Sequence, residues 1–169
     1  IKLFVGSGSP ELGQKVSEYL KQPVSECEVI EFPNENLFVK LNGSVRGQDV
    51  YVIQTTSSPV HRNLMELLIL VDACRRASAA KITAVVPYFG YSRQDRRPRA
   101  TRSAITAKLV ANMIQGAGVN RLLTIDLHSD QIQGFFDIPV DNVYASPVLL
   151  GDAYRQRYEN MIVVSPDVG

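Results

Sequence analysis

Residues 82–126 read ITAVVPYFGYSRQDRRPRATRSAITAKLVANMIQGAGVNRLLTID, and this stretch decides the fold class. Two short apolar runs, Ile82 to Pro87 and Arg121 to Asp126, enclose a segment of helical period from Ile105 to Ala117. A strand, a helix and a second strand in this order form the crossover unit of a parallel sheet. The stretch therefore predicts an α/β fold.

The same alternation continues on both sides of this unit. Further strands are expected at Lys2 to Val5, Cys27 to Phe32, Leu37 to Leu41, Val50 to Thr55 and Met161 to Val164, and further helices at Pro10 to Leu20, His61 to Ala77 and Pro147 to Tyr158. Ser9 before Pro10 is typical of a helix N-cap followed by proline at the first helical position. The helix from His61 is apolar around most of its circumference, which predicts burial against the sheet or a partner subunit. We expect one domain, residues 1–169, with a mostly parallel sheet flanked by helices.

Composition excludes several classes of protein. The 169 residues include 18 Lys and Arg against 17 Asp and Glu, and this balance gives no sign of a polyanion-binding or membrane-surface protein. Cys27 and Cys74 form neither a CxxC pair nor a disulfide framework. No apolar stretch approaches the roughly 18 residues of a membrane span, and the first residues lack the pattern of a signal peptide. We expect a soluble, cytoplasmic protein.

The loop after the first strand of the quoted stretch is rich in arginine. Five arginines fall between Arg93 and Arg102. Ligands of open α/β sheets bind at the carboxyl ends of the strands, and guanidinium groups bind phosphates well. The aromatic residues of PYFGY could provide a surface for a base, and Gln94 can both donate and accept hydrogen bonds. The loop therefore favours a polyphosphate site; a solvated basic loop or an arm touching RNA is the alternative.

Three other segments that follow predicted strands are weaker candidates for a functional site. His128 follows the strand that ends at Asp126 and is a catalytic candidate, although a lone histidine is more often structural. Asp167 follows the last strand and could hold Mg²⁺, or could be an ordinary strand-end aspartate. Gly6 to Gly13 joins a strand to a helix, but its spacing matches neither dinucleotide nor P-loop patterns, so a plain turn is favoured over a nucleotide contact.

Six motifs together resemble one family. PYFGYSRQDRR, ITAKLVANM, DLHSDQIQGFFDIPVDN, MELLILVDA, SVRG and SPDVG are similar to the amino-terminal domain of ribose-phosphate pyrophosphokinases, and the resemblance runs nearly end to end. It implies a phosphoribosyltransferase-like, Rossmann-like domain. The implied reaction transfers the diphosphoryl group of ATP to the 1-hydroxyl of ribose 5-phosphate with Mg²⁺. Members of the family continue past SPDVG into a second catalytic domain, which this chain lacks, so we expect the chain to be incomplete by itself.

The resemblance also implies roles for individual residues. ATP contacts are implied for Arg93 and Gln94 and, from a neighbouring subunit, for Phe32, Asn34 and Asn36. The catalytic residues implied are Arg93 and His128, and the Mg²⁺-ATP site includes His128 and Asp167. A regulatory ADP or phosphate site between subunits is implied for Ser44, Arg46, Gln133, Asp141 and Asn142. Asn36 departs from the acidic residue usual at its position, which bears on adenine selectivity.

The resemblance further implies a homo-oligomer, a hexamer of dimers, with no nucleic-acid or membrane partner. Two other functions stay open on the residues themselves. One is a non-catalytic regulatory subunit of the same family. The other is a nucleic-acid-binding α/β domain that uses the arginine loop and its aromatic residues. Mg-ATP binding without a steeply salt-dependent affinity for RNA would exclude the second.

Overall fold

The computed structural model of the chain describes residues 1–165, which form a five-stranded parallel sheet and a separate hairpin. The sheet contains β1 (Lys2–Val5), β4 (Asp49–Ile53), β5 (Lys81–Val86), β6 (Arg121–Ile125) and β7 (Val140–Val143), in the order β1-β4-β5-β6-β7. Every pairing in this sheet is parallel. The antiparallel hairpin consists of β2 (Cys27–Glu31) and β3 (Leu37–Leu41). The predicted α/β fold with a mostly parallel sheet is confirmed.

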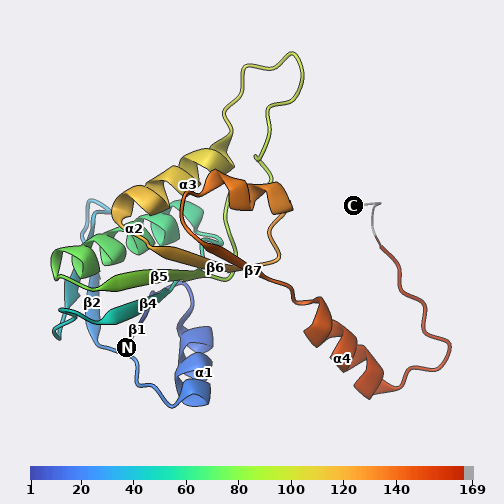
Figure 1. Cartoon of the computed structure of the whole chain (residues 1–169), viewed down its shortest axis with the longest axis horizontal. Coiled ribbons are helices and arrows are strands. Elements are labelled where there is room, and N and C mark those ends of the chain that lie inside the picture. The colour runs from blue at the N-terminus through green and yellow to red at the C-terminus, as the bar shows by residue number, and fades with distance from the viewer. Residues whose placement is uncertain (166–169) are drawn as a thin grey trace.

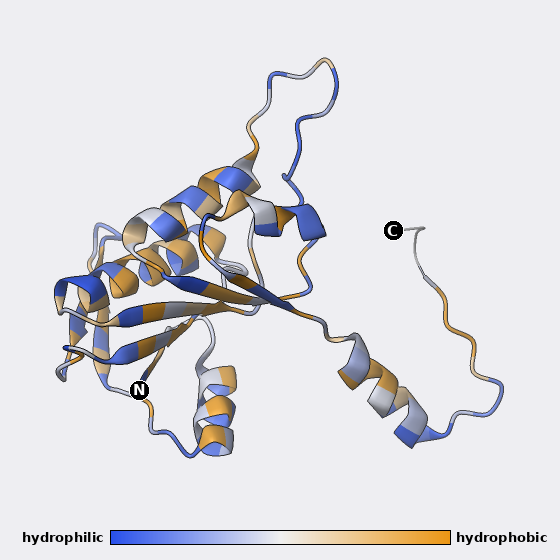
Figure 2. Ribbon diagram, viewed as in Figure 1, coloured by the Kyte–Doolittle hydropathy of each residue, from blue (hydrophilic) through white to orange (hydrophobic). Residues whose placement is uncertain are grey.

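Helices cover both faces of the sheet (Figure 1). α2 (Val60–Arg76) and α3 (Thr106–Ala117) lie on one face, and α1 (Pro10–Leu20) lies on the other. The apolar positions of α2 and α3 face the strands (Figure 2), where Leu67, Val52 and Ala84 are completely buried. Burying a leucine or valine side chain contributes about 1.5–3 kcal/mol, so this layer contributes substantially to the stability of the fold. The helix predicted from His61 is buried against the sheet.

Close packing at the start of the chain depends on one glycine. A Cβ atom at Gly13 of α1 would lie 2.3 Å from Val5 Cγ1, so only glycine lets α1 approach β1 this closely. The helix begins at Pro10 as expected, but Ser9 does not cap it with its side chain. Ser9 Oγ instead accepts a hydrogen bond from Thr55 N at 2.9 Å. The serine therefore ties the β1–α1 turn to the end of β4.

Three elements differ from the sequence-based expectations. β7 and the 3₁₀ helix η1 (Asp130–Phe135) were not expected, because VDN carries no strand pattern and a 3₁₀ helix of six residues is too short to give a periodic signal. The strand expected at Met161 to Val164 is wrong, since these residues have no regular structure. A strand needs a neighbour that accepts and donates its backbone hydrogen bonds, and within residues 1–165 this segment pairs with none.

The carboxyl-terminal helix stands apart from the sheet (Figure 1). α4 (Ser146–Gln156) contains no buried residue. Its apolar residues Val148 and Leu149 are 70% and 68% exposed. No helix within the described part of the chain has both the length and the apolarity needed to cross a membrane. The site-bearing part of the molecule is therefore the sheet with the loops that follow β5 and β6.

Candidate anion site at the carboxyl end of the sheet

The arginine-rich loop leaves the carboxyl end of β5 and returns to α3, extending well beyond the sheet (Figure 1). Its first residues are fixed. Gly90 N donates a hydrogen bond to Thr56 Oγ1 at 2.7 Å, and Phe89 is buried against Phe136 with ring centroids 5.8 Å apart. Arg93 follows this anchored start and is exposed to solvent. The guanidinium group is thus held near the sheet while it remains accessible to a ligand.

The aromatic residues of this loop have different roles. Phe89 belongs to the core, so it offers no surface to a base, whereas Tyr88 is exposed. Tyr91 has a left-handed backbone with φ of 63°, a conformation that is uncommon for a residue other than glycine. Its hydroxyl lies 2.9 Å from His61 Nδ1, and its carbonyl accepts a hydrogen bond from Gln94 N at 2.9 Å. Tyr91 therefore fixes the turn that presents Arg93.

Gln94 closes the loop onto α3. Gln94 Oε1 accepts a hydrogen bond from Thr106 Oγ1 at 2.5 Å, and its backbone carbonyl accepts one from Ala107 N at 3.2 Å. Both acceptors thus hold the first turn of α3. Gln94 is nevertheless exposed, in the same turn as Arg93.

The turn that contains His128 lies against the arginine-rich loop. Ser129 Oγ donates a hydrogen bond to Asp95 Oδ2 at 2.7 Å. Asp95 lies two residues after Arg93, and Ser129 lies one residue after the exposed His128. The structure thus brings together the loops after β5 and β6. Asp95 was visible in the sequence only as the carboxylate within RQDRR, and Ser129 gave no separate signal.

Asp130, in the same turn, accepts hydrogen bonds from residues in β7 and just after it. Its Oδ1 accepts hydrogen bonds from Tyr144 at 3.0 Å and from Asn142 Nδ2 at 3.4 Å. The bond to Asp130 raises the pKa of the Tyr144 hydroxyl above its ordinary value. Gln133 Nε2 donates to the carbonyl of Asp130 at 3.3 Å, and Asn142 Oδ1 accepts from Leu127 N at 3.1 Å. Within the protomer, the two bonds of Asn142 attach the His128 turn to β7.

The structure does not bring the five candidate regulatory residues together in one protomer. Ser44 and Arg46 lie in the loop before β4, where Arg46 N donates to Ser44 Oγ at 3.4 Å. Asp141 lies in β7 and accepts hydrogen bonds from Arg121 at 2.5 and 2.9 Å. This bidentate contact lowers the pKa of Asp141. Two strands separate β4 from β7, a distance of roughly 14 Å at the usual strand spacing.

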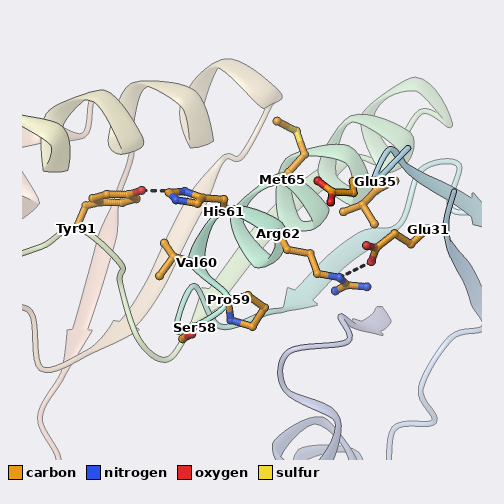
Figure 3. Close-up of a pocket in the computed structure, with 10 residues that line it drawn as sticks. Glu31, Glu35, Ser58, Pro59, Val60, His61, Arg62, Met65 and Tyr91 are labelled. Carbon is orange, nitrogen blue, oxygen red and sulfur yellow. Dashed lines mark hydrogen bonds and ion pairs between the residues drawn. The ribbon is translucent and has the colours of Figure 1, made fainter. Parts of the chain in front are cut away.

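The candidate nucleotide contacts from the hairpin lie at its tip. Phe32, Asn34 and Asn36 are all exposed in the turn between β2 and β3. Phe32 N donates to the carbonyl of Asn36 at 2.9 Å, and this bond closes the turn. Within residues 1–165, no hydrogen bond or ion pair joins this turn to Arg93 or His128 of the same chain. Beside the turn lies an open cavity of about 750 Å³, lined in part by Glu35 and Tyr91 (Figure 3).

The described residues offer a metal ion no preformed cage. Asp167 lies outside the described residues, and within residues 1–165 no group of three or more His, Cys, Asp or Glu side chains could hold a metal. Near His128, Asp126 accepts hydrogen bonds from Ala145 N, and Asp95 accepts the one from Ser129. Mg²⁺ is usually bound through one or two carboxylates together with substrate phosphates. The residues fit a cation that arrives with a polyphosphate.

The backbone amides of the glycine-rich turn between β1 and α1 donate hydrogen bonds to side chains of the same protein. Ser7 N donates to Glu66 Oε1 at 2.7 Å, and Gly8 N donates to Gln54 Oε1 at 3.0 Å. Both acceptor side chains are completely buried. Amides engaged in this way do not bind phosphate, which supports a plain turn. The signal for Glu66 was a single glutamate within the apolar MELL segment of α2.

Comparisons of the sequence and of the structure with known proteins match one family. Residues 1–118 match the family model described as the N-terminal domain of ribose phosphate pyrophosphokinase. Ribose-phosphate pyrophosphokinases from Marinomonas sp. and Burkholderia pseudomallei are each 56% identical over all 169 residues. The crystal structure of phosphoribosylpyrophosphate synthetase from Mycobacterium smegmatis is 42% identical, with a TM-score of 0.88 over 91% of the chain.

The matches cover only part of the relatives. This chain covers 54% of the Marinomonas protein, 53% of the Burkholderia protein and 51% of the Mycobacterium chain. The chain thus spans about half the length of the curated relatives it matches. At this identity and coverage, the chain belongs to the ribose-phosphate pyrophosphokinase family, and its residues 1–118 correspond to the amino-terminal domain of that family.

Proposed function

We propose that this chain supplies the ATP-binding part of a ribose-phosphate pyrophosphokinase. The observation that carries the proposal is the hydrogen bond between Ser129 and Asp95, because it joins the arginine-rich loop to the His128 turn at the carboxyl end of the sheet. Open α/β sheets bind their ligands at this edge. The proposed reaction transfers the diphosphoryl group of ATP to the 1-hydroxyl of ribose 5-phosphate.

In the proposed reaction, a bond forms between the 1-hydroxyl oxygen and the β-phosphorus of ATP. The bond from that phosphorus to the bridging oxygen of the α-phosphate breaks, AMP leaves, and the hydroxyl proton is released to solvent. Catalysis of phosphoryl transfer rests on positioning and on neutralising charge at the phosphate oxygens. Arg93 supplies a guanidinium for this purpose, and His128 donates a hydrogen bond to a phosphate or to a metal-bound water. His128 and Asp167 would hold Mg²⁺ that arrives with the nucleotide, and the cation would supply positive charge at the phosphate oxygens.

The remaining roles follow the resemblance to the family. Gln94 contacts the nucleotide, and a neighbouring subunit contributes Phe32, Asn34 and Asn36, which requires a homo-oligomer. The regulatory residues Ser44, Arg46, Gln133, Asp141 and Asn142 form a site for ADP or phosphate between subunits. This arrangement agrees with their separation in one protomer. A second domain supplies the ribose 5-phosphate site, and residues 1–169 form the first. The substrates are consistent with a cytoplasmic enzyme.

The proposal is tested with the longer protein that contains this chain. Purified protein with Mg-ATP and ribose 5-phosphate is expected to release AMP and to form phosphoribosyl pyrophosphate in equal amounts. Tight Mg-ATP binding without product would instead indicate a regulatory subunit. Weak ATP binding with an RNA affinity that falls steeply with salt would indicate a nucleic-acid-binding domain.

A further inference from the structure

Arg62 of α2 connects three separate parts of the molecule. Arg62 Nε donates to Glu31 Oε2 of the hairpin at 2.8 Å. Its Nη1 donates to Glu66 Oε2 at 2.8 Å and to Ser7 Oγ at 2.7 Å. One guanidinium group therefore links the last residue of β2 to the helix and to the β1–α1 turn, and Figure 3 shows its contact with Glu31.

The inner end of this connection is rigid. The side chain of Glu66 has no exposed surface, whereas those of Arg62 and Glu31 are 33% and 43% exposed. The Glu66 carboxylate accepts hydrogen bonds from the Ser7 amide, from the Ser7 hydroxyl and from Arg62. Charged groups held by several hydrogen bonds in a buried site have few alternative positions. Glu66 therefore fixes the place of the Arg62 guanidinium.

The outer end of the connection is otherwise weakly supported. Val39 in the middle of β3 is packed into the core, but every residue from Phe32 to Asn36 is exposed. The cavity of about 750 Å³ separates this turn from the first residues of α2. Among residues 1–165, the Arg62–Glu31 pair is the hydrogen-bonded contact that crosses this gap (Figure 3). Phe32, which is covalently next to Glu31, packs on Phe38 within the hairpin itself.

We propose that Arg62 is a positioning residue for the Phe32–Asn36 turn: by holding Glu31, it fixes the position of the turn that carries Phe32, Asn34 and Asn36. Arg62 touches no nucleotide and takes no part in the chemistry. The effect of Arg62 on ATP binding rests on the proposed function, in which this turn contacts the nucleotide of a neighbouring subunit. Its effect on the turn itself is independent of that function.

The turn is tested in the 169-residue chain by amide hydrogen exchange measured by NMR. The reporters are the amides of Phe32 and Glu35, which donate to the carbonyls of Asn36 and Phe32 at 2.9 and 2.8 Å. Glu31→Gln removes the charge from the pair with Arg62 and leaves the contacts of Glu66 intact. We expect exchange of both amides to accelerate about two- to fivefold, as for a partly exposed ion pair. The amides of β4 and β5 should keep their wild-type rates.

Glu28→Gln is the matched control. Glu28 also lies in β2, and its carboxylate pairs with Lys40 across the hairpin at 3.2 Å, so the same substitution breaks an ion pair that does not reach α2. This variant should leave exchange at Phe32 and Glu35 unchanged. Arg62→Gln also removes the contacts with Ser7 and Glu66, so it should accelerate exchange at least as much as Glu31→Gln, and the double variant should not exceed Arg62→Gln. If Glu31→Gln has no larger effect than Glu28→Gln, the positioning role is wrong.

The consequence for ATP is tested in the longer protein. Glu31→Gln should raise KM for ATP about two- to fivefold while kcat stays unchanged, since a misplaced binding turn weakens ground and transition states equally. Phe32→Ala separates the two hypotheses. If Phe32→Ala raises KM and Glu31→Gln does not, the positioning role fails. If neither variant changes KM although Glu31→Gln still accelerates exchange, the proposed nucleotide contact of the turn fails and the inference about ATP fails with it.

Discussion

The Ser129 hydroxyl donates a 2.7 Å hydrogen bond to the Asp95 carboxylate, which joins the loop after β5 to the turn after β6. The two strands are neighbours in a parallel sheet, so their carboxyl ends lie at the same edge. Arg93 and His128 are each within two residues of this bond. The contact therefore determines how the most basic segment of the chain lies relative to its candidate catalytic histidine.

Removing the Ser129 hydroxyl should loosen this arrangement. Ser129→Ala deletes one hydrogen bond to a carboxylate and is expected to weaken Mg-ATP binding by about 0.5–1.5 kcal/mol, with little effect on stability. Calorimetric titration measures the affinity. Ser103→Ala is the matched control, because the Ser103 hydroxyl contacts Thr101 within the arginine-rich loop at 3.1 Å. Equal Mg-ATP affinities for the two variants would show that the arrangement of the two loops for binding does not depend on the Ser129–Asp95 bond.

Gly90 should tolerate no side chain. A Cβ atom there would lie 2.6 Å from the backbone oxygen of Thr56, in the segment after β4 that is hydrogen-bonded to the carbonyl of Tyr88, so the backbone would have to shift. Gly90→Ala is therefore expected to lower the free energy of unfolding by about 1–3 kcal/mol, the usual cost of overpacking. In the control Gly116→Ala, nothing lies within 4 Å of the new Cβ in α3. The free energy of unfolding of Gly116→Ala should rise by about 0.4–1 kcal/mol. Urea denaturation should therefore show Gly90→Ala to be less stable, and Gly116→Ala more stable, than the wild type.

The buried carboxylate of Glu66 should be costly to replace by an apolar side chain. Glu66→Leu leaves the Ser7 amide and the Arg62 guanidinium without their acceptor. We expect a loss of about 1.5–3 kcal/mol in the free energy of unfolding. Glu18→Leu, at an exposed position of α1, should change it by less than about 0.5 kcal/mol. If denaturant curves show similar losses for both variants, the buried network does not stabilise the fold.

The thiols should be protected in the folded chain. Burial raises the pKa of Cys74 to about 12 and also raises the pKa of Cys27, where the Glu66 charge adds to the effect of burial. The thiolate is the reactive form. At pH 8, a thiol reagent should therefore modify Cys74 only after unfolding in urea, and Cys27 more slowly than in unfolded chain. Stoichiometric modification of Cys74 in the native protein would contradict its burial.

The same pKa shift predicts how Cys74 affects stability at alkaline pH. The folded-state pKa of Cys74 is above the unfolded value of 9.0, so the folded protein keeps the thiol proton more tightly than the unfolded chain does. The resulting contribution to the free energy of unfolding is complete below pH 9 and is lost as the pH rises toward 12. The free energy of unfolding should fall by at most about 1.4 kcal/mol per pH unit from this group. Cys74→Val removes the thiol, so its stability should fall less steeply between pH 9 and 12. Parallel pH profiles for the two proteins would exclude this linkage.

The sequence predicted the elements that have a periodic pattern or a clear boundary. β1, β3 and α1 have the predicted bounds, whereas α2 differs from prediction by one residue at each end and α3 by one residue at its start. β7 was missed because its VDNV sequence is polar at two of four positions and becomes a strand only by pairing with β6. The strand expected at Met161 to Val164 failed for the opposite reason, since an apolar run forms no strand without a partner and residues 1–165 provide none for it.

Sequence reasoning found the segments of the candidate site but not the contacts between them. Arg93 and His128 stood out as charged or titratable groups at strand ends. Asp95 and Ser129 did not, because a hydrogen bond between residues 34 positions apart leaves no local pattern. Arg62 and Glu31 were missed for the same reason, as the pair depends on how the hairpin folds back against α2.

The most direct test of the account is calorimetric titration of Mg-ATP into the wild-type chain, Arg93→Ala and Arg76→Ala. Arg76 is an exposed arginine of α2 paired with Asp72 at 2.7 Å, so its variant removes the same charge outside the proposed site. We expect Arg93→Ala to weaken binding by about 1.5–3 kcal/mol and Arg76→Ala to leave it unchanged. The same affinity in all three proteins would contradict an anion site built on the arginine-rich loop.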